Sequence, residues 1–241
     1  MRTDKKGGFS LFGHLGGSAA ESQVLPLSRK ISGGASFSGN ERDSIYINIG
    51  GKDYVSISGI TGLDDPGDGR SLAILDYDRD GWPDFVVASV TTPTLQLYRN
   101  QMGDRSSAGV RKNRMLAVRF VGGNHSAAPS KEWTNRDGYG AVLTVDLDGI
   151  TIVREHRAGE GLAAQNSTTM LIGIGERSVA KSLTVRWPSD KTQDIGKVPA
   201  NTLVTVYENP AHSPTGSAVV VKPYKVASIR PPKQRDLALL R

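Results

Sequence analysis

The chain has no cysteine, few aromatic residues and no long apolar run. Without cysteine there is no disulfide framework, no thiolate zinc site and no cysteine nucleophile. No stretch approaches the roughly 18 consecutive apolar residues that a membrane-spanning helix needs. Residues 1–10 carry charges but no apolar segment follows them, so no cleavable export signal is visible. We therefore expect neither a disulfide scaffold nor a membrane span.

The positive charge of the chain lies at its two ends. A formal net charge of +6 over 241 residues suggests an anionic partner. Residues 1–30 hold five basic against two acidic side chains, and residues 209–241 hold six against one, which leaves the body of the chain at −2. Surfaces that bind single-stranded nucleic acid place aromatic side chains among the charges, whereas residues 209–241 contain only Tyr224. We expect no nucleic-acid partner.

Short β-type runs separated by turn residues dominate the body of the chain, and no window of helical length has a sustained period near 3.6 residues. Gly50 and Gly51 join the first two runs as a hairpin signal. Trp187, at the end of one run, is predicted to fill a core. The sequence thus predicts an all-β protein with ten strands: 44–48, 54–58, 72–75, 85–89, 95–99, 115–121, 141–147, 150–155, 182–187 and 203–207.

The densest acidic segment of the chain is DYDRDGWPD, residues 76–84. Its aspartates alternate with other residues, so in a tight loop their carboxylates can converge, and Gly81 permits a left-handed turn. Calcium takes about six to eight oxygen ligands, which such loops supply from alternate positions. Carboxylates packed without a cation repel one another. The segment predicts a Ca²⁺ site formed by Asp76, Asp78, Asp80, Asp84 and the carbonyl of Trp82.

This loop differs from an EF-hand. Val87 stands where an EF-hand has a bidentate glutamate, and the flanking runs are strands. Water or the aspartates at 64, 65 and 68 are candidates for the missing ligand. Magnesium fits less well because it requires a strict octahedron. The alternative is a solvated acidic turn without an ion.

Residues 69–87, which include the loop, resemble an FG-GAP/VCBS repeat, the calcium-binding blade unit of integrin-type β-propellers. The resemblance implies that the four aspartates and the Trp82 carbonyl are metal ligands. The segments SIYIN at 44–48 and QLYRN at 96–100 echo one another about fifty residues apart. That spacing suits a four-stranded propeller blade.

The C-terminal half is similar to ASPIC/UnbV domains, which follow FG-GAP/VCBS propellers in cartilage acidic protein-like secreted proteins. Two positions depart from the family pattern: LIGIG at 171–175 replaces His-Phe-Gly-Leu-Gly, and Asp190 replaces a glycine. The resemblance rests on motifs that occur in the family's order: NRDGYGA (135–141), REHRAGEG (154–161), QNS (165–167), GIG (173–175), VRWPS (185–189) and VPAN (198–201).

Together the two resemblances imply a partial β-propeller-type repeat followed by an ASPIC/UnbV β-domain. One blade cannot close a propeller, which takes at least about four. The chain is therefore either a fragment of a longer family member or a variant whose blade packs against its own C-terminal domain. We predict a flexible Gly/Ser-rich segment at 1–40, the calcium-loop repeat at 41–110, the ASPIC/UnbV-like domain at 111–208, and a basic, proline-containing tail at 209–241 that is extended or disordered in isolation.

The predicted function is non-enzymatic, calcium-dependent adhesion or recognition of a protein or glycan. The family resemblance implies an extracellular or periplasmic location. The alternative is a metal-dependent hydrolase or lyase that acts on an extracellular polymer. Such an enzyme needs a general base or an open-site histidine at the metal, and residues 76–84 contain no histidine. The four histidines of the chain share no metal-ligand or catalytic-triad spacing.

Overall fold

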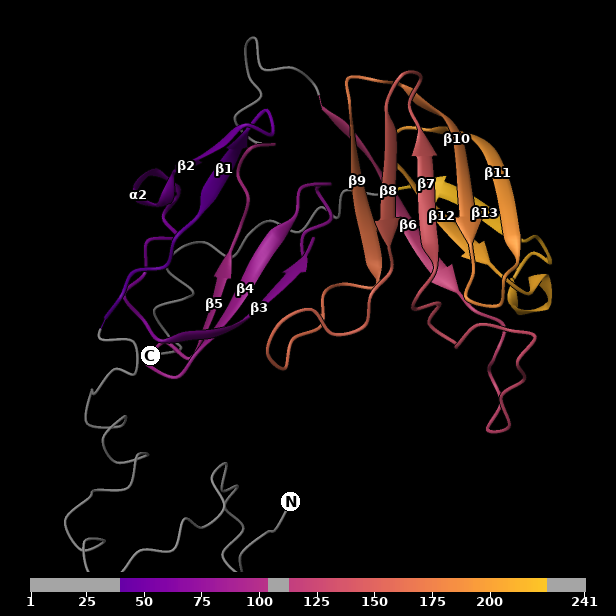
Figure 1. Cartoon of the computed structure of the whole chain (residues 1–241), viewed down its shortest axis with the longest axis horizontal. Helices are drawn as coiled ribbons and strands as arrows, with labels where there is room; N and C mark the ends of the chain where they lie inside the picture. Colours follow the sequence, from indigo (N-terminus) through magenta and orange to yellow (C-terminus); the bar gives the residue numbers. More distant parts are fainter. Residues whose placement is uncertain (1–39, 104–112, 225–241) are drawn as a thin grey trace, which may run out of the picture.

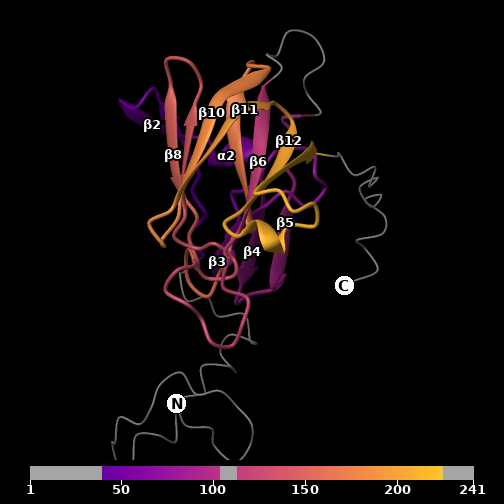
Figure 2. The ribbon, with the colours of Figure 1, turned by 90° about the vertical axis from the view of Figure 1, so that its right-hand side faces the viewer.

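A computed structural model describes residues 40–103 and 113–224, in which the chain is all-β (Figures 1 and 2). The predicted all-β fold is confirmed. The predicted flexible segment at 1–40 lies outside the described residues except for Asn40, and so do residues 225–241 of the predicted tail. The helical segments of the described ranges are too short to cross a bilayer.

Two four-stranded sheets pack face to face and form the larger part of the molecule, and Figure 2 shows them as two layers. The sheets are antiparallel except for one parallel pair, β6 with β12. The first sheet has the order β11 (Thr192–Pro199), β10 (Val179–Arg186), β7 (Val142–Asp146), β8 (Thr151–Glu155). The second has the order β13 (Val219–Pro223), β12 (Thr202–Tyr207), β6 (Arg114–Val121), β9 (Thr169–Gly175).

The hydrophobic core lies between these two sheets. Successive side chains of a strand point to opposite faces, and alternate residues of β7 and β12 are accordingly buried in a single cluster. Trp187 joins this cluster with no exposed surface and meets Phe120 edge-to-face at 6.0 Å between ring centroids. The prediction that Trp187 fills a core is confirmed.

Five strands near the N-terminus form two smaller sheets. β1 (Tyr46–Ile49) and β2 (Asp53–Ser56) form a hairpin, and a single helical turn, α2 (Ser58–Thr61), follows. β3 (Gly69–Leu75), β4 (Asp84–Ser89) and β5 (Leu95–Tyr98) form a three-stranded antiparallel sheet. The sequence favoured one four-stranded blade, but the described strands form a two-stranded and a three-stranded sheet.

Three strands that the sequence analysis did not predict belong to the large sheets: β9, β11 and β13. Part of the tail predicted from residue 209 belongs to the sandwich, because β13 pairs with β12 and extends the second sheet. A 3₁₀ turn, η1 (Pro210–His212), connects them. Pro223 ends β13 at the edge of the sheet, where a residue without an N–H is tolerated.

Glycines of the NRDGYGA motif are required by close packing. Gly138 and Gly140 have φ values of 71° and 89°, a left-handed conformation that side chains other than glycine rarely adopt. A Cβ at Gly138 would lie 2.6 Å from the Phe120 Cβ, and one at Gly140 would lie 2.9 Å from the Pro188 Cγ. The turn into β7 can therefore pass over the core only with glycine at these two positions.

Glu208 anchors the long loop that follows β6. The residue is 4% exposed at the end of β12. Its carboxylate accepts hydrogen bonds from the backbone N–H groups of Gly123 (2.8 Å) and Thr134 (2.7 Å), from the Thr134 hydroxyl (3.0 Å) and from the Ser189 hydroxyl. One buried charge thus satisfies donors from three segments of the chain.

Asn201, in the turn between β11 and β12, joins the first and last strands of the sandwich. Its backbone N–H donates to the Met115 carbonyl at 2.7 Å, and its side-chain oxygen accepts from the Met115 N–H at 3.4 Å. The Tyr224 N–H donates to the Asn201 carbonyl at 2.9 Å. The start of β6 and the residue after β13 therefore meet at one end of the second sheet.

The β3–β5 sheet is joined to the sandwich through the β8–β9 loop, which Figure 1 shows between the two parts. The Ile74 N–H donates to the Asn166 side-chain oxygen at 2.8 Å, and the Ser167 N–H donates to the Ile74 carbonyl at 2.9 Å. These bonds occupy backbone groups on the outer edge of β3. Without these bonds the free edge of β3 could pair with a strand of another chain, and the loop prevents this at Ile74.

Candidate metal centre

The acidic loop connects β3 to β4 and closes their antiparallel pairing. Leu75, the last residue of β3, pairs with Asp84, the first of β4. Between them Arg79 and Gly81 have φ values of 58° and 90°, so the backbone turns left-handed twice. The prediction that Gly81 allows the turn is confirmed. The loop then presents its N–H groups to Asp76, whose oxygens accept from Asp80 N at 3.0 Å and Gly81 N at 2.9 Å.

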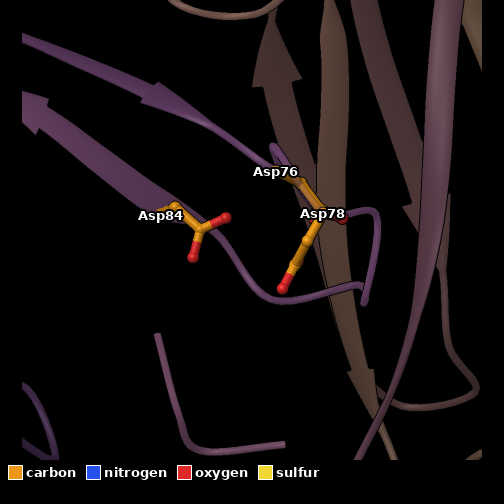
Figure 3. A group of neighbouring side chains, drawn as sticks. All are labelled: Asp76, Asp78 and Asp84. Carbon is orange, nitrogen blue, oxygen red and sulfur yellow. The ribbon is translucent and has the colours of Figure 1, made fainter. Parts of the chain in front are cut away.

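Three of the predicted ligands converge. One carboxylate oxygen from each of Asp76, Asp78 and Asp84 lies within 4.8 Å of the other two (Figure 3). Asp78 is 6% exposed and Asp84 has no exposed surface. Three carboxylates at this separation repel one another strongly in a partly buried site. Their oxygens form the donor set that hard divalent cations prefer, so these residues fit Ca²⁺.

Backbone hydrogen bonds hold Asp84 in this position. Its two oxygens accept from the Tyr77 N–H at 3.1 Å and from the Asn100 N–H at 2.8 Å. Each carboxylate oxygen has two lone pairs, so one hydrogen bond at each oxygen still leaves a lone pair for a cation. Burial raises the pKa of Asp84, and the two hydrogen bonds oppose that rise.

Asp80 and Trp82 lie beside the three converging carboxylates. Asp80 is outside that group: its carboxylate accepts from the Trp82 N–H at 2.8 Å and faces a nitrogen of Arg99 at 3.4 Å. Burial raises the pKa of Asp80 to about 6, and the neighbouring aspartates add to the rise. The roles of Asp80 and of the Trp82 carbonyl as metal ligands remain predictions.

Arg99, which the sequence analysis did not single out, supplies the positive charge of the site. Its Nε lies 2.6 Å from the Asp78 Oδ2, and its Nη2 lies 3.4 Å from the Asp80 Oδ2. The residue comes directly after β5 and so ties the third strand of the sheet to the loop. Arg99 and a cation would share the Asp78 carboxylate, which lowers the charge available to the cation.

Tyr224 connects the acidic loop to the sandwich, and the sequence analysis did not single it out either. Its hydroxyl donates to the Asp76 Oδ2 at 2.8 Å, and its ring lies 5.0 Å from the Arg79 guanidinium carbon. Burial and the hydrogen bond to Asp76 raise the pKa of Tyr224. Gly81 is also close to the sandwich, since a Cβ there would lie 3.3 Å from the Met115 Cε. No sequence pattern signals these contacts, because Tyr224 is about 150 residues from the loop.

Comparison with known families identifies part of the sandwich. Residues 131–213 match the ASPIC and UnbV family. The match includes β7 to β12 and lies outside the calcium-loop repeat predicted at 41–110. A search of curated proteins found no match. The predicted resemblance to ASPIC/UnbV domains is thus confirmed for this segment, whereas the match says nothing of the FG-GAP/VCBS resemblance.

Proposed function

We propose that this chain is a non-enzymatic recognition or adhesion protein in which calcium fixes the loop at 76–84. The observation that supports this most strongly is the convergence of Asp76, Asp78 and Asp84 within 4.8 Å. A bound cation would neutralise the mutual repulsion of these carboxylates. Asp84, held by two backbone N–H groups, and Asp76, held by two more, would present their remaining lone pairs to it.

We further propose that β3, β4 and β5 form an FG-GAP/VCBS-type blade. Two features support this: the acidic loop lies in the first hairpin of an antiparallel sheet, and a segment that matches the ASPIC and UnbV family follows in the chain. By the same resemblance the protein acts outside the cell or in the periplasm, where it binds a protein or a glycan. Extracellular calcium modules bind with dissociation constants on the order of 10⁻⁴ to 10⁻³ M. We expect this range here, since Arg99 shares Asp78.

Calorimetric titration with CaCl₂ tests the calcium site. We expect one site per chain, and about 5 °C of thermal stabilisation in 5 mM calcium relative to EDTA, as mass action gives for an affinity near 10⁻⁴ M. Asp78→Asn should abolish both effects. Asp148→Asn, which alters an exposed carboxylate in the turn between β7 and β8, should leave both unchanged. A melting temperature equal in calcium and EDTA, with no heat of binding, would remove calcium from the proposal.

A further inference from the structure

A cavity of about 570 Å³ lies where the β3–β4 hairpin meets the sandwich. Ile74, Asp76 and Arg79 form its wall on the hairpin side, and the end of β8 with the β8–β9 loop forms the opposite wall. Tyr224 closes one side. The volume is within the range of about 300–1,000 Å³ that small-ligand sites occupy. Neither the proposed calcium site nor the family match gives this cavity a role.

The wall of the cavity carries four arginines and three carboxylates, those of Asp76, Glu155 and Glu160. Arg157 forms an ion pair with Glu155 at 3.1 Å. Within residues 40–103 and 113–224, the other three arginines of the wall have no carboxylate at ion-pair distance: Arg79, Arg119 and Arg154. Guanidinium groups bind planar carboxylates through pairs of N–H bonds. This wall is therefore suited to an anion.

His156 contributes a buried polar atom to the same wall. The residue is 5% exposed, and its ring stacks on Tyr139 at 4.7 Å and lies 5.1 Å from the Phe120 ring. Burial lowers the pKa of His156, and the backbone of Asp137 opposes that shift. The Nε2 atom has no hydrogen-bond partner among the described residues. In the neutral tautomer that carries its proton on Nδ1, this Nε2 is an acceptor. The atom is buried, so a ligand O–H group reaches it only when the neighbouring side chains make room.

The remaining wall provides further acceptors and an apolar surface. The carboxylate of Glu160 lies at the cavity, and carboxylate oxygens accept from hydroxyl groups. Met170, Leu171 and Leu203 supply apolar contact area. A ligand that matches this wall has an anionic group for the arginines, several hydroxyl groups and a partly apolar face. A sugar ring with a carboxylate has all three, whereas an acidic peptide has few hydroxyl groups.

We propose that this cavity binds an acidic saccharide, a uronate whose carboxylate pairs with the arginines and whose hydroxyl groups donate to His156 Nε2 and Glu160. The proposal rests on the proposed recognition function, because it names the ligand class of that function. It does not depend on calcium.

Titration calorimetry of the full chain with a hyaluronan tetrasaccharide, which alternates glucuronate and N-acetylglucosamine, tests the proposal. The neutral N-acetylglucosamine tetramer and a hexaglutamate peptide serve as comparison ligands. We expect the uronate to bind at least about tenfold more tightly than either, since the neutral sugar lacks the charge-assisted bonds and the peptide leaves the hydroxyl acceptors unsatisfied. Absence of uronate binding at millimolar concentration, or equal binding of the peptide, would overturn the proposal.

Variants locate the site. Arg154→Ala should weaken uronate binding by about tenfold or more, and His156→Phe, which keeps a ring between Phe120 and Tyr139, should weaken it by a smaller factor. Arg186→Ala removes the same charge from an exposed position of β10 outside the cavity and should have no effect. An equal loss in Arg186→Ala would show non-specific charge attraction and overturn the assignment. If His156→Phe does not fold, the effect of Arg154→Ala on uronate binding alone decides whether the ligand binds in this cavity.

One further variant separates this proposal from the calcium proposal. Asp78 belongs to the converging carboxylates but does not line the cavity. Asp78→Asn should therefore abolish calcium binding and retain uronate binding within about twofold, in calcium and in EDTA alike. If the wild-type chain binds calcium but no uronate, the result overturns the saccharide proposal and supports the calcium proposal.

Discussion

Glu208 is a buried carboxylate whose partners are all hydrogen-bond donors from the loop after β6 and from Ser189. Glu208→Gln preserves the shape but turns an amide N–H₂ toward those donors. We expect the free energy of unfolding to fall by about 3 kcal/mol, as hydrogen bonds to a charged group are lost. Urea unfolding measures this. Glu132→Gln, at an exposed position, is the matched control, and an equal loss in both variants would contradict the assigned role.

His156 makes stability depend on pH. Burial lowers the pKa of His156 from its ordinary value of 6.5, while Asp137 and Glu160 oppose the shift. The unfolded chain therefore binds a proton at a higher pH than the folded chain does, so stability is lost as pH falls below about 6.5. His156→Phe should show a smaller loss between pH 7.5 and 5.5 in urea unfolding. Equal losses in the two proteins would show that His156 is not the group responsible.

Single residues of the acidic cluster were predictable only where the sequence carries a local spacing rule. Alternating aspartates followed by glycine mark Asp76 and Asp78 because the loop itself brings them together. Arg99 and Tyr224 contact the same loop from the end of β5 and from beyond β13. Nothing in their own sequence surroundings signals a carboxylate partner, since that contact exists only once the sheets have packed.

At the scale of elements, the β8–β9 loop hydrogen-bonds to the unpaired edge of β3 and covers it. Asn166→Ala removes the acceptor of the Ile74 N–H. We expect faster hydrogen exchange at the Ile74 amide and a loss of about 1 kcal/mol in stability, the typical contribution of one hydrogen bond. Thr168→Ala, two positions along at an exposed site, should change neither. Unaltered exchange at Ile74 in Asn166→Ala would show that the loop does not hold the edge.

The ten strands predicted from alternating apolar residues are all present, and the three missed strands lack that pattern. β11 contains Gly196 and ends at Pro199, residues typical of turns. β13 lies between prolines and resembles a tail by composition. β9 contains two glycines, a residue type that is depleted in strands. These three strands are stabilised by pairing with β10, β12 and β6, which local propensity does not encode.

At the scale of the whole molecule, Tyr224 couples the small sheet to the sandwich. Tyr224→Phe removes the hydroxyl that donates a hydrogen bond to Asp76, and it keeps the ring beside Arg79. We expect the β3–β5 amides to exchange faster while those of the sandwich core stay protected, because the two parts then open separately. Tyr207→Phe, a tyrosine of β12 distant in sequence from the loop, is the control. Uniform exchange changes across the chain would contradict the coupling role.

The choice between a fragment and a self-packed variant was left open by the sequence. In the structure the β3 edge and the acidic loop contact the chain's own sandwich through Asn166, Ser167 and Tyr224. Yet β1 and β5 still expose large apolar side chains, with Tyr46 at 59% and Leu95 at 66%. The β3–β5 sheet thus has one covered edge, a result that depends on long-range contacts and not on strand propensity.

The junction at Asn201 also determines how the sandwich would respond to mechanical load. The start of β6 and the residue after β13 meet there, at the same end of one sheet. A force applied between the segment before β6 and the segment after β13 would break the hydrogen bonds at that end one after another. It would not shear whole strands past one another. Tension would first break the few hydrogen bonds at Asn201 and then peel β13 from β12, while the core between the sheets stays unloaded.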